Sequence, residues 1–268
     1  MLQTSTTPPE EVILSYNTLR KAIGWLGLLL PFMLIAGNEL LRYFDLLNSP
    51  LMVDTACTPS YTLLGHVKPT ISDTYYTPMG EYFTGTLGSI ALFMLCYKGH
   101  KLRPGEHLSD NLLTNLIGIC AFLVALFPTS ATMPTGLPCL NDNFRVFQSG
   151  IITNTFHFTS ATILFLCLGR MSYTNFRRSN KQEEFGLGSD DKYFKILGII
   201  IYLSVALLFV YKVLENHLPE SIKDYCPFYW LEATALVAFG LSWLIKGKAD
   251  MVYLPKKLGM IKSKPMEE

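Results

Sequence analysis

The chain has 268 residues, of which half are hydrophobic and only 16% are charged. An average soluble domain carries about 25% charged residues, so this composition argues against soluble domains and favours a membrane protein. The net charge of +1 at pH 7 provides no broad basic surface, which argues against a nucleic-acid partner.

Six apolar runs follow one another along the chain, each long enough to cross a hydrocarbon core of about 30 Å as a helix. Pro31 falls inside the first run, where a membrane helix tolerates a kink, and Asp110 is the expected N-cap of the third. Because backbone groups in lipid must be paired within their own segment, we predict an all-α bundle of six transmembrane helices. The runs occupy residues 20–41, 79–97, 111–127, 150–169, 193–213 and 228–245.

The polar stretches between the runs predict loops and define the ends of the domain. Residues 42–77 and 128–148 are rich in proline and polar side chains, which is typical of loops. The chain therefore divides into an N-terminal segment (1–19), a transmembrane domain (20–245) and a basic tail (246–268).

Lysine and arginine residues predict the orientation in the membrane. Lys98, Lys101 and Arg103 lie between the second and third runs, and the linker after the fourth run and the tail are also basic. The alternate connections hold few basic residues, so the positive-inside rule places both termini in the cytoplasm. We expect a multi-pass protein of a bacterial inner membrane or of a eukaryotic secretory-pathway or plasma membrane.

Three cysteines, Cys57, Cys139 and Cys226, fall in the connections predicted to lie outside the cytoplasm. Disulfides persist in oxidising compartments, so one bridge among these three is one prediction. Three separate thiols are the alternative, and the spacing does not select a pair.

Ionisable side chains near membrane segments are costly, so each marks a candidate site. Several gather towards the predicted non-cytoplasmic side, where we expect a polar ligand-binding pocket. The alternative is structural, because a carboxylate in a first helical turn is stabilised by the helix dipole and a lone histidine commonly bonds a neighbouring helix. The candidate ligand-binding residues are Asp73, Tyr76, Glu81, His157 and Glu232.

Motifs for metals and cofactors do not occur in the sequence. It has no HxxxH pair, no CxxC pair and no glycine-rich phosphate loop, so we predict neither a metal nor a cofactor. Ser72 and Asp73 precede a helix without the glycine pattern of a nucleophile elbow, which weakens a Ser-His-Asp interpretation.

Residues 69–83, PTISDTYYTPMGEYF, resemble a motif of the eukaryotic Frag/DRAM/Sfk-like family of six-span membrane proteins. Asn115 and His157 fit that family loosely, whereas Tyr75 stands where the family has glycine. Bacterial six-span proteins with a Ser-x-x-Tyr-Tyr segment are equally similar. The resemblance implies a lipid-related role without fixing a reaction. The matching positions are Pro69, Ile71, Ser72, Asp73, Thr74, Pro78 and Glu81.

Three hypotheses for function follow from these observations. The leading one is a regulatory membrane protein that binds a lipid headgroup or small amphiphile in the polar pocket, with membrane lipid as its partner. The second is a membrane-embedded lipid hydrolase or transferase in which His157 and a carboxylate act as acid and base. The third is a channel or effector built as a homo-oligomer of this chain.

Overall fold

A computed structural model describes the chain over residues 10–43, 67–77, 79–98, 108–129, 147, 150–177 and 190–247. Within these ranges the secondary structure is helical and no strand occurs. The prediction of an all-α protein is therefore confirmed for this part of the chain. The long helices are α1 (Glu10–Tyr43), α2 (Gly80–Cys96), α3 (Asp110–Leu126), α4 (Ile151–Arg170), α6 (Asp190–Leu214) and α8 (Pro227–Lys246).

Short helical segments lie between or beside the long helices. The 3₁₀ helix η1 (Ser72–Tyr76) precedes α2, and the π-helical turn η3 (Met171–Phe176) continues α4. The 3₁₀ turn η4 (Glu215–His217) and the short helix α7 (Glu220–Lys223) connect α6 to α8.

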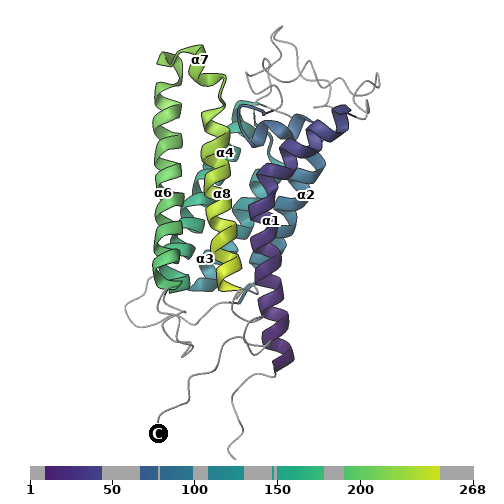
Figure 1. Cartoon of the computed structure of the whole chain (residues 1–268), viewed down its shortest axis with the longest axis vertical. Coiled ribbons are helices and arrows are strands. Elements are labelled where there is room, and N and C mark those ends of the chain that lie inside the picture. Colours follow the sequence, from purple (N-terminus) through teal and green to yellow (C-terminus); the bar gives the residue numbers. More distant parts are fainter. Residues whose placement is uncertain are drawn as a thin grey trace, which may run out of the picture.

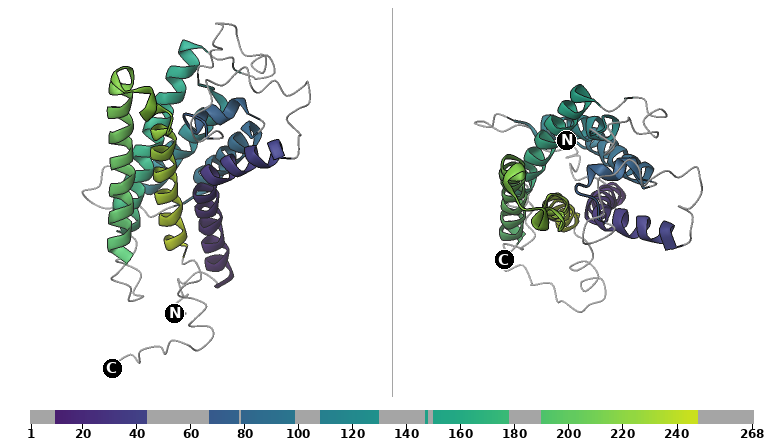
Figure 2. Two further views of the ribbon diagram at one scale, coloured as in Figure 1. Left: turned by 45° about the horizontal axis from the view of Figure 1, so that its top comes forward. Right: turned by 90° about the horizontal axis from the view of Figure 1, so that it is seen from above.

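The long helices run alternately up and down in one bundle, so that α1 begins and α8 ends at the same end (Figure 1; Figure 2). Helix α8 packs against both α1 and α6, and α3 packs against both α2 and α4. The starts of α2, α4 and α8 lie at the opposite end, together with η1 and α7; we call this the η1 end.

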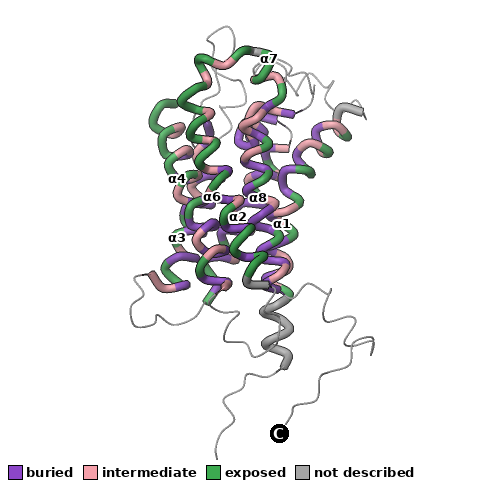
Figure 3. Tube along the Cα trace, turned by 60° about the vertical axis from the view of Figure 1, so that its left-hand side comes forward, coloured by how far each residue is buried: buried purple, intermediate pink, exposed green. Residues whose placement is uncertain are grey.

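Four of the six helices are long and apolar enough to cross a membrane: Thr18–Leu41, Ile151–Phe176, Lys192–His217 and Ser221–Lys246. Helices α2 and α3 have 17 residues each, or about 26 Å of helix, slightly less than an average hydrocarbon core. Apolar side chains also cover the outside of the bundle, as with Leu203 and Phe209, which are 57% and 71% exposed. Figure 3 shows exposed residues, coloured green, along α4 and α6. An apolar exterior is expected of a protein whose solvent is lipid.

Two details at the cytoplasmic side of the predicted topology differ from the sequence-based expectation. The N-cap of α3 is Ser109 rather than Asp110, because Ser109 has an extended backbone and its Oγ accepts the Leu112 N–H at 3.1 Å. Asp110 is instead buried and accepts a 2.6 Å hydrogen bond from the Asn175 side chain. Asn175 belongs to η3, so the fourth helix continues past its predicted end at residue 169.

Helix α1 bends within its length, as Figure 2 shows, and Pro31 lies inside it. Proline removes a helical hydrogen bond and is the usual cause of such a bend. The hydroxyl of Tyr229 on α8 donates to the Pro31 carbonyl at 2.6 Å. Below the bend, Gly24 faces Gly240 so closely that a Cβ on Gly240 would lie 2.6 Å from the Gly24 carbonyl oxygen. These contacts hold α1 tightly against α8.

Candidate functional site

Residues 67–77 form a compact turn in which threonine side chains make hydrogen bonds to the backbone of the turn. The Thr70 N–H donates to the Asp73 carboxylate at 3.1 Å, and the Asp73 N–H donates back to the Thr70 hydroxyl at 3.0 Å. The hydroxyls of Thr74 and Thr77 each donate to the carbonyl three residues earlier. Such local side-chain bonds favour turns over longer helices, so this polar sequence folds as a 3₁₀ turn rather than as an extension of α2.

Hydrogen bonds join the turn to the start of α8. The backbone N–H of Ile71 donates to the Glu232 carboxylate at 2.7 Å, and both residues are buried. The Tyr229 N–H, which lies in the first turn of α8 and has no helical partner there, donates to the Pro69 carbonyl at 3.1 Å. Glu232 therefore takes part in the hydrogen bonding that joins two parts of the chain 161 residues apart.

The other side of the turn faces α4 and the end of α3. The Ser72 hydroxyl lies 2.8 Å from Nε2 of His157, and Nδ1 of His157 lies 2.6 Å from the Phe127 carbonyl oxygen. The Tyr76 hydroxyl donates to the Thr129 carbonyl just beyond α3. Ser72, Tyr76 and His157 are at most 6% exposed, so these polar contacts are buried within the η1 end.

The Phe127 carbonyl determines which nitrogen of His157 carries the proton. A carbonyl only accepts hydrogen bonds, so Nδ1 must carry the hydrogen, and in the neutral ring Nε2 is then the acceptor for the Ser72 hydroxyl. Phe127 follows α3 and precedes proline, so its carbonyl is one that the helix itself leaves without a partner. His157 thus hydrogen-bonds both the Phe127 carbonyl at the end of α3 and the hydroxyl of Ser72.

Asp73 is the half-buried carboxylate of the turn. Burial raises the pKa of its carboxyl above the ordinary value, while the bonds with Thr70 and the charges of Lys68 and Lys212 act in the opposite direction. Asp73 also interacts electrostatically with Glu232, so the η1 end presents two neighbouring carboxylates. Charges of both signs therefore surround this turn.

The structure brings four of the five predicted ligand-binding residues together around η1. Asp73 and Tyr76 belong to the turn, and His157 and Glu232 bond its neighbouring residues. Glu81 lies apart: it is exposed in the first turn of α2. Ser72 was not among the predicted ligand-binding residues, and its contact with His157 is visible only in the structure.

Of the three cysteines predicted to lie outside the cytoplasm, one belongs to the described residues. Cys226 is buried before α8, with Sγ 3.4 Å from the Val67 carbonyl oxygen, while Cys57 and Cys139 lie outside the described residues. The predicted disulfide therefore stays a prediction. Among the described residues, no group of three histidine, cysteine, aspartate or glutamate side chains is placed to hold a metal ion.

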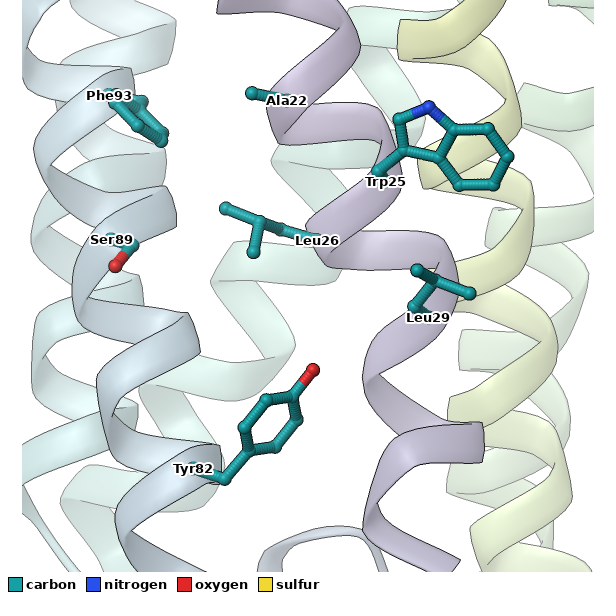
Figure 4. A pocket seen from close by; sticks show the side chains of 7 residues that line it. All are labelled: Ala22, Trp25, Leu26, Leu29, Tyr82, Ser89 and Phe93. Carbon is teal, nitrogen blue, oxygen red and sulfur yellow. The ribbon is translucent and has the colours of Figure 1, made fainter. Parts of the chain in front are cut away.

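A second feature is an apolar groove between α1 and α2, with a volume of about 390 Å³ (Figure 4). Trp25 and Leu29 line it from α1, and Tyr82 and Phe93 line it from α2. None of the five predicted ligand-binding residues lines this groove, so the apolar groove and the polar turn are separate features of the bundle.

No protein-family model, curated protein or solved structure matches this chain. The resemblance of residues 69–83 to the Frag/DRAM/Sfk-like family therefore stays a prediction based on a short motif.

Proposed function

We propose that this protein crosses the membrane six times with both termini in the cytoplasm, and that its η1 end binds the headgroup of a membrane lipid or a small amphiphile. The distribution of basic residues supports this orientation. Helix α1 starts and helix α8 ends at the same end of the bundle, as expected for an even number of crossings (Figure 1). The η1 end then faces the outer leaflet.

One observation carries the binding proposal: polar side chains from a loop, α4 and α8 are buried together at one end of an otherwise apolar bundle. Polar groups at membrane depth are costly and usually mark a functional site. Asp73 lies near Lys68, and this pairing of opposite charges matches a zwitterionic headgroup better than one of a single sign. The apolar groove between α1 and α2 supports association with acyl chains on the lipid-facing surface.

The orientation can be tested with epitope tags and protease. One tag follows residue 268, and another is inserted after Leu218, between η4 and α7. In cells, spheroplasts or sealed vesicles whose non-cytoplasmic face is outside, the tag after Leu218 should be digested and the C-terminal tag protected, and permeabilisation should expose both. Digestion of the C-terminal tag in such sealed preparations before permeabilisation would contradict the proposed orientation.

Headgroup binding can be tested by native mass spectrometry of the purified full chain titrated with phosphatidylcholine or phosphatidylglycerol. We expect retention of phosphatidylcholine, with at least a tenfold loss of affinity in Glu232→Gln, which replaces the ionisable carboxyl group but keeps an acceptor for the Ile71 N–H. Glu81→Gln is the matched control, because Glu81 is an exposed carboxylate near the same end. Equal lipid retention by both variants and the wild type would refute the site.

A further inference from the structure

The hydroxyl of Ser72 has a different partner from those of comparable hydroxyl groups in the bundle. Thr74, Thr77 and Ser242 each donate to a backbone carbonyl three residues earlier, as hydroxyls with a structural role commonly do. Ser72 instead lies 2.8 Å from the imidazole Nε2 of His157, on a helix 85 residues further along the chain. A serine on the basic nitrogen of a histidine is the arrangement of an activated nucleophile.

The environment of His157 completes this arrangement. Nδ1–H is held by the Phe127 carbonyl at 2.6 Å, which leaves Nε2 as a base directed at Ser72. In serine hydrolases a carboxylate holds the histidine in the correct orientation. A carbonyl oxygen that accepts the Nδ1–H hydrogen bond can hold it in the same way.

We infer that Ser72 is a nucleophile and His157 its general base, and that the pair transfers the acyl group of a carboxylic ester carried by a membrane lipid. This inference rests on the proposed binding of lipid at the η1 end. A lipid ester is the favoured substrate because the pair lies at the end of a bundle whose sides are apolar, so substrates that partition into the membrane are concentrated around it.

The reaction proceeds in two balanced steps. The Ser72 Oγ attacks the ester carbonyl carbon while its proton passes to Nε2 of His157; the bond to the leaving alcohol breaks, and His157 returns that proton to the alcohol oxygen. The product is an acyl ester on Ser72 and a free alcohol. Water, or the hydroxyl of a second lipid, then attacks the acyl ester with His157 again accepting and returning a proton, which yields a carboxylic acid or a new ester and regenerates Ser72.

Covalent labelling of the full chain with a hexadecyl fluorophosphonate tests this inference, because a nucleophilic serine displaces fluoride from phosphorus. We expect an adduct mapped to Ser72 by peptide mass spectrometry in the wild type. The adduct should disappear in Ser72→Ala and form about 10²–10⁴ times more slowly in His157→Asn. The asparagine amide retains a donor near Nδ1 for the Phe127 carbonyl, which helps the variant to fold.

Ser242→Ala is the matched control, because Ser242 is equally buried and bonds a carbonyl; its labelling at Ser72 should equal that of the wild type. An unlabelled Ser72 in folded wild-type protein, or a labelling rate unchanged in folded His157→Asn, would overturn the inference. Phosphatidylcholine retention measured on the same preparations separates the two proposals. Retention without a Ser72 adduct leaves the binding site standing and rejects only the catalytic pair, whereas loss of retention in the wild type rejects the binding proposal.

Discussion

The carboxylate of Glu232 accepts a 2.7 Å hydrogen bond from the backbone N–H of Ile71, and this bond joins a polar turn to a transmembrane helix. Both ends of the bond are buried, with Ile71 3% and Glu232 7% exposed. An acidic side chain in an apolar bundle thus satisfies a backbone donor that has no partner within its own turn. Glu232 therefore stabilises the fold in addition to its proposed part in binding.

Removal of the Glu232 acceptor should destabilise the protein more than replacement of the carboxyl group by an amide. Glu232→Ala leaves the Ile71 N–H buried without a partner, which costs about 1–3 kcal/mol, whereas Glu232→Gln keeps an acceptor. We expect the midpoint of unfolding in detergent to fall clearly for alanine and little for glutamine. If both variants unfolded with the same midpoint, the hydrogen bond would contribute nothing to stability.

Asp73 predicts a specific dependence of stability on pH. Because burial raises the pKa of this carboxyl in the folded protein above its ordinary value of 3.8, the folded state keeps a proton that the unfolded chain has released. Stability contributed by Asp73 is therefore lost as pH rises from 3.8 through the raised folded-state pKa, and is constant above it.

Asp73→Asn does not titrate, so the midpoint of the wild type minus that of Asp73→Asn isolates this effect. We expect the difference to decrease as pH rises through this window and then to level off. Thermal unfolding in one detergent at a series of pH values measures this difference in midpoint. The other titrating groups are present in both proteins, so their contributions cancel. A difference that increases with pH would show that the hydrogen bonds from Thr70, rather than burial, dominate Asp73.

The close contact between α1 and α8 should not tolerate a larger side chain. Gly240→Leu forces atoms towards the Gly24 carbonyl and the Leu28 backbone, and overpacking of this kind costs about 1–3 kcal/mol. Gly85→Ala is the control, because a Cβ there meets nothing within 4 Å and alanine favours a helix. We expect a lower unfolding midpoint for Gly240→Leu and an equal or higher one for Gly85→Ala; the reverse order would contradict this packing.

The bond from Tyr229 to the bend in α1 gives a further test. Tyr229→Phe removes the 2.6 Å bond to the Pro31 carbonyl but keeps the buried ring, so it should lower stability by about 0.5–1.5 kcal/mol. Tyr225→Phe, at a tyrosine that is 55% exposed, should change the unfolding midpoint much less. Equal effects of the two substitutions would mean that the hydroxyl of Tyr229 is not used in the fold.

The helices themselves could be predicted because the signal for them is local. Each of the six apolar runs corresponds to a long helix, and the end of the third run at residue 127 differs from that of α3 by one residue. The cap of that helix was harder to predict, because Ser109 and Asp110 are both good capping residues and only the backbone conformation distinguishes them. The number of membrane crossings stays a prediction for α2 and α3.

An apolar helical protein with polar residues towards one end could be predicted from the chain alone, since hydrophobic runs and the depth of a residue along a helix are read directly from position. Which of those polar residues meet depends on how the helices pack. Glu81 and Glu232 both lie near helix starts, but the rotation of each helix directs Glu232 inward to Ile71 and leaves Glu81 exposed. The contact of Ser72 with His157 likewise depends on how a turn packs against a helix 85 residues away, which no local pattern encodes.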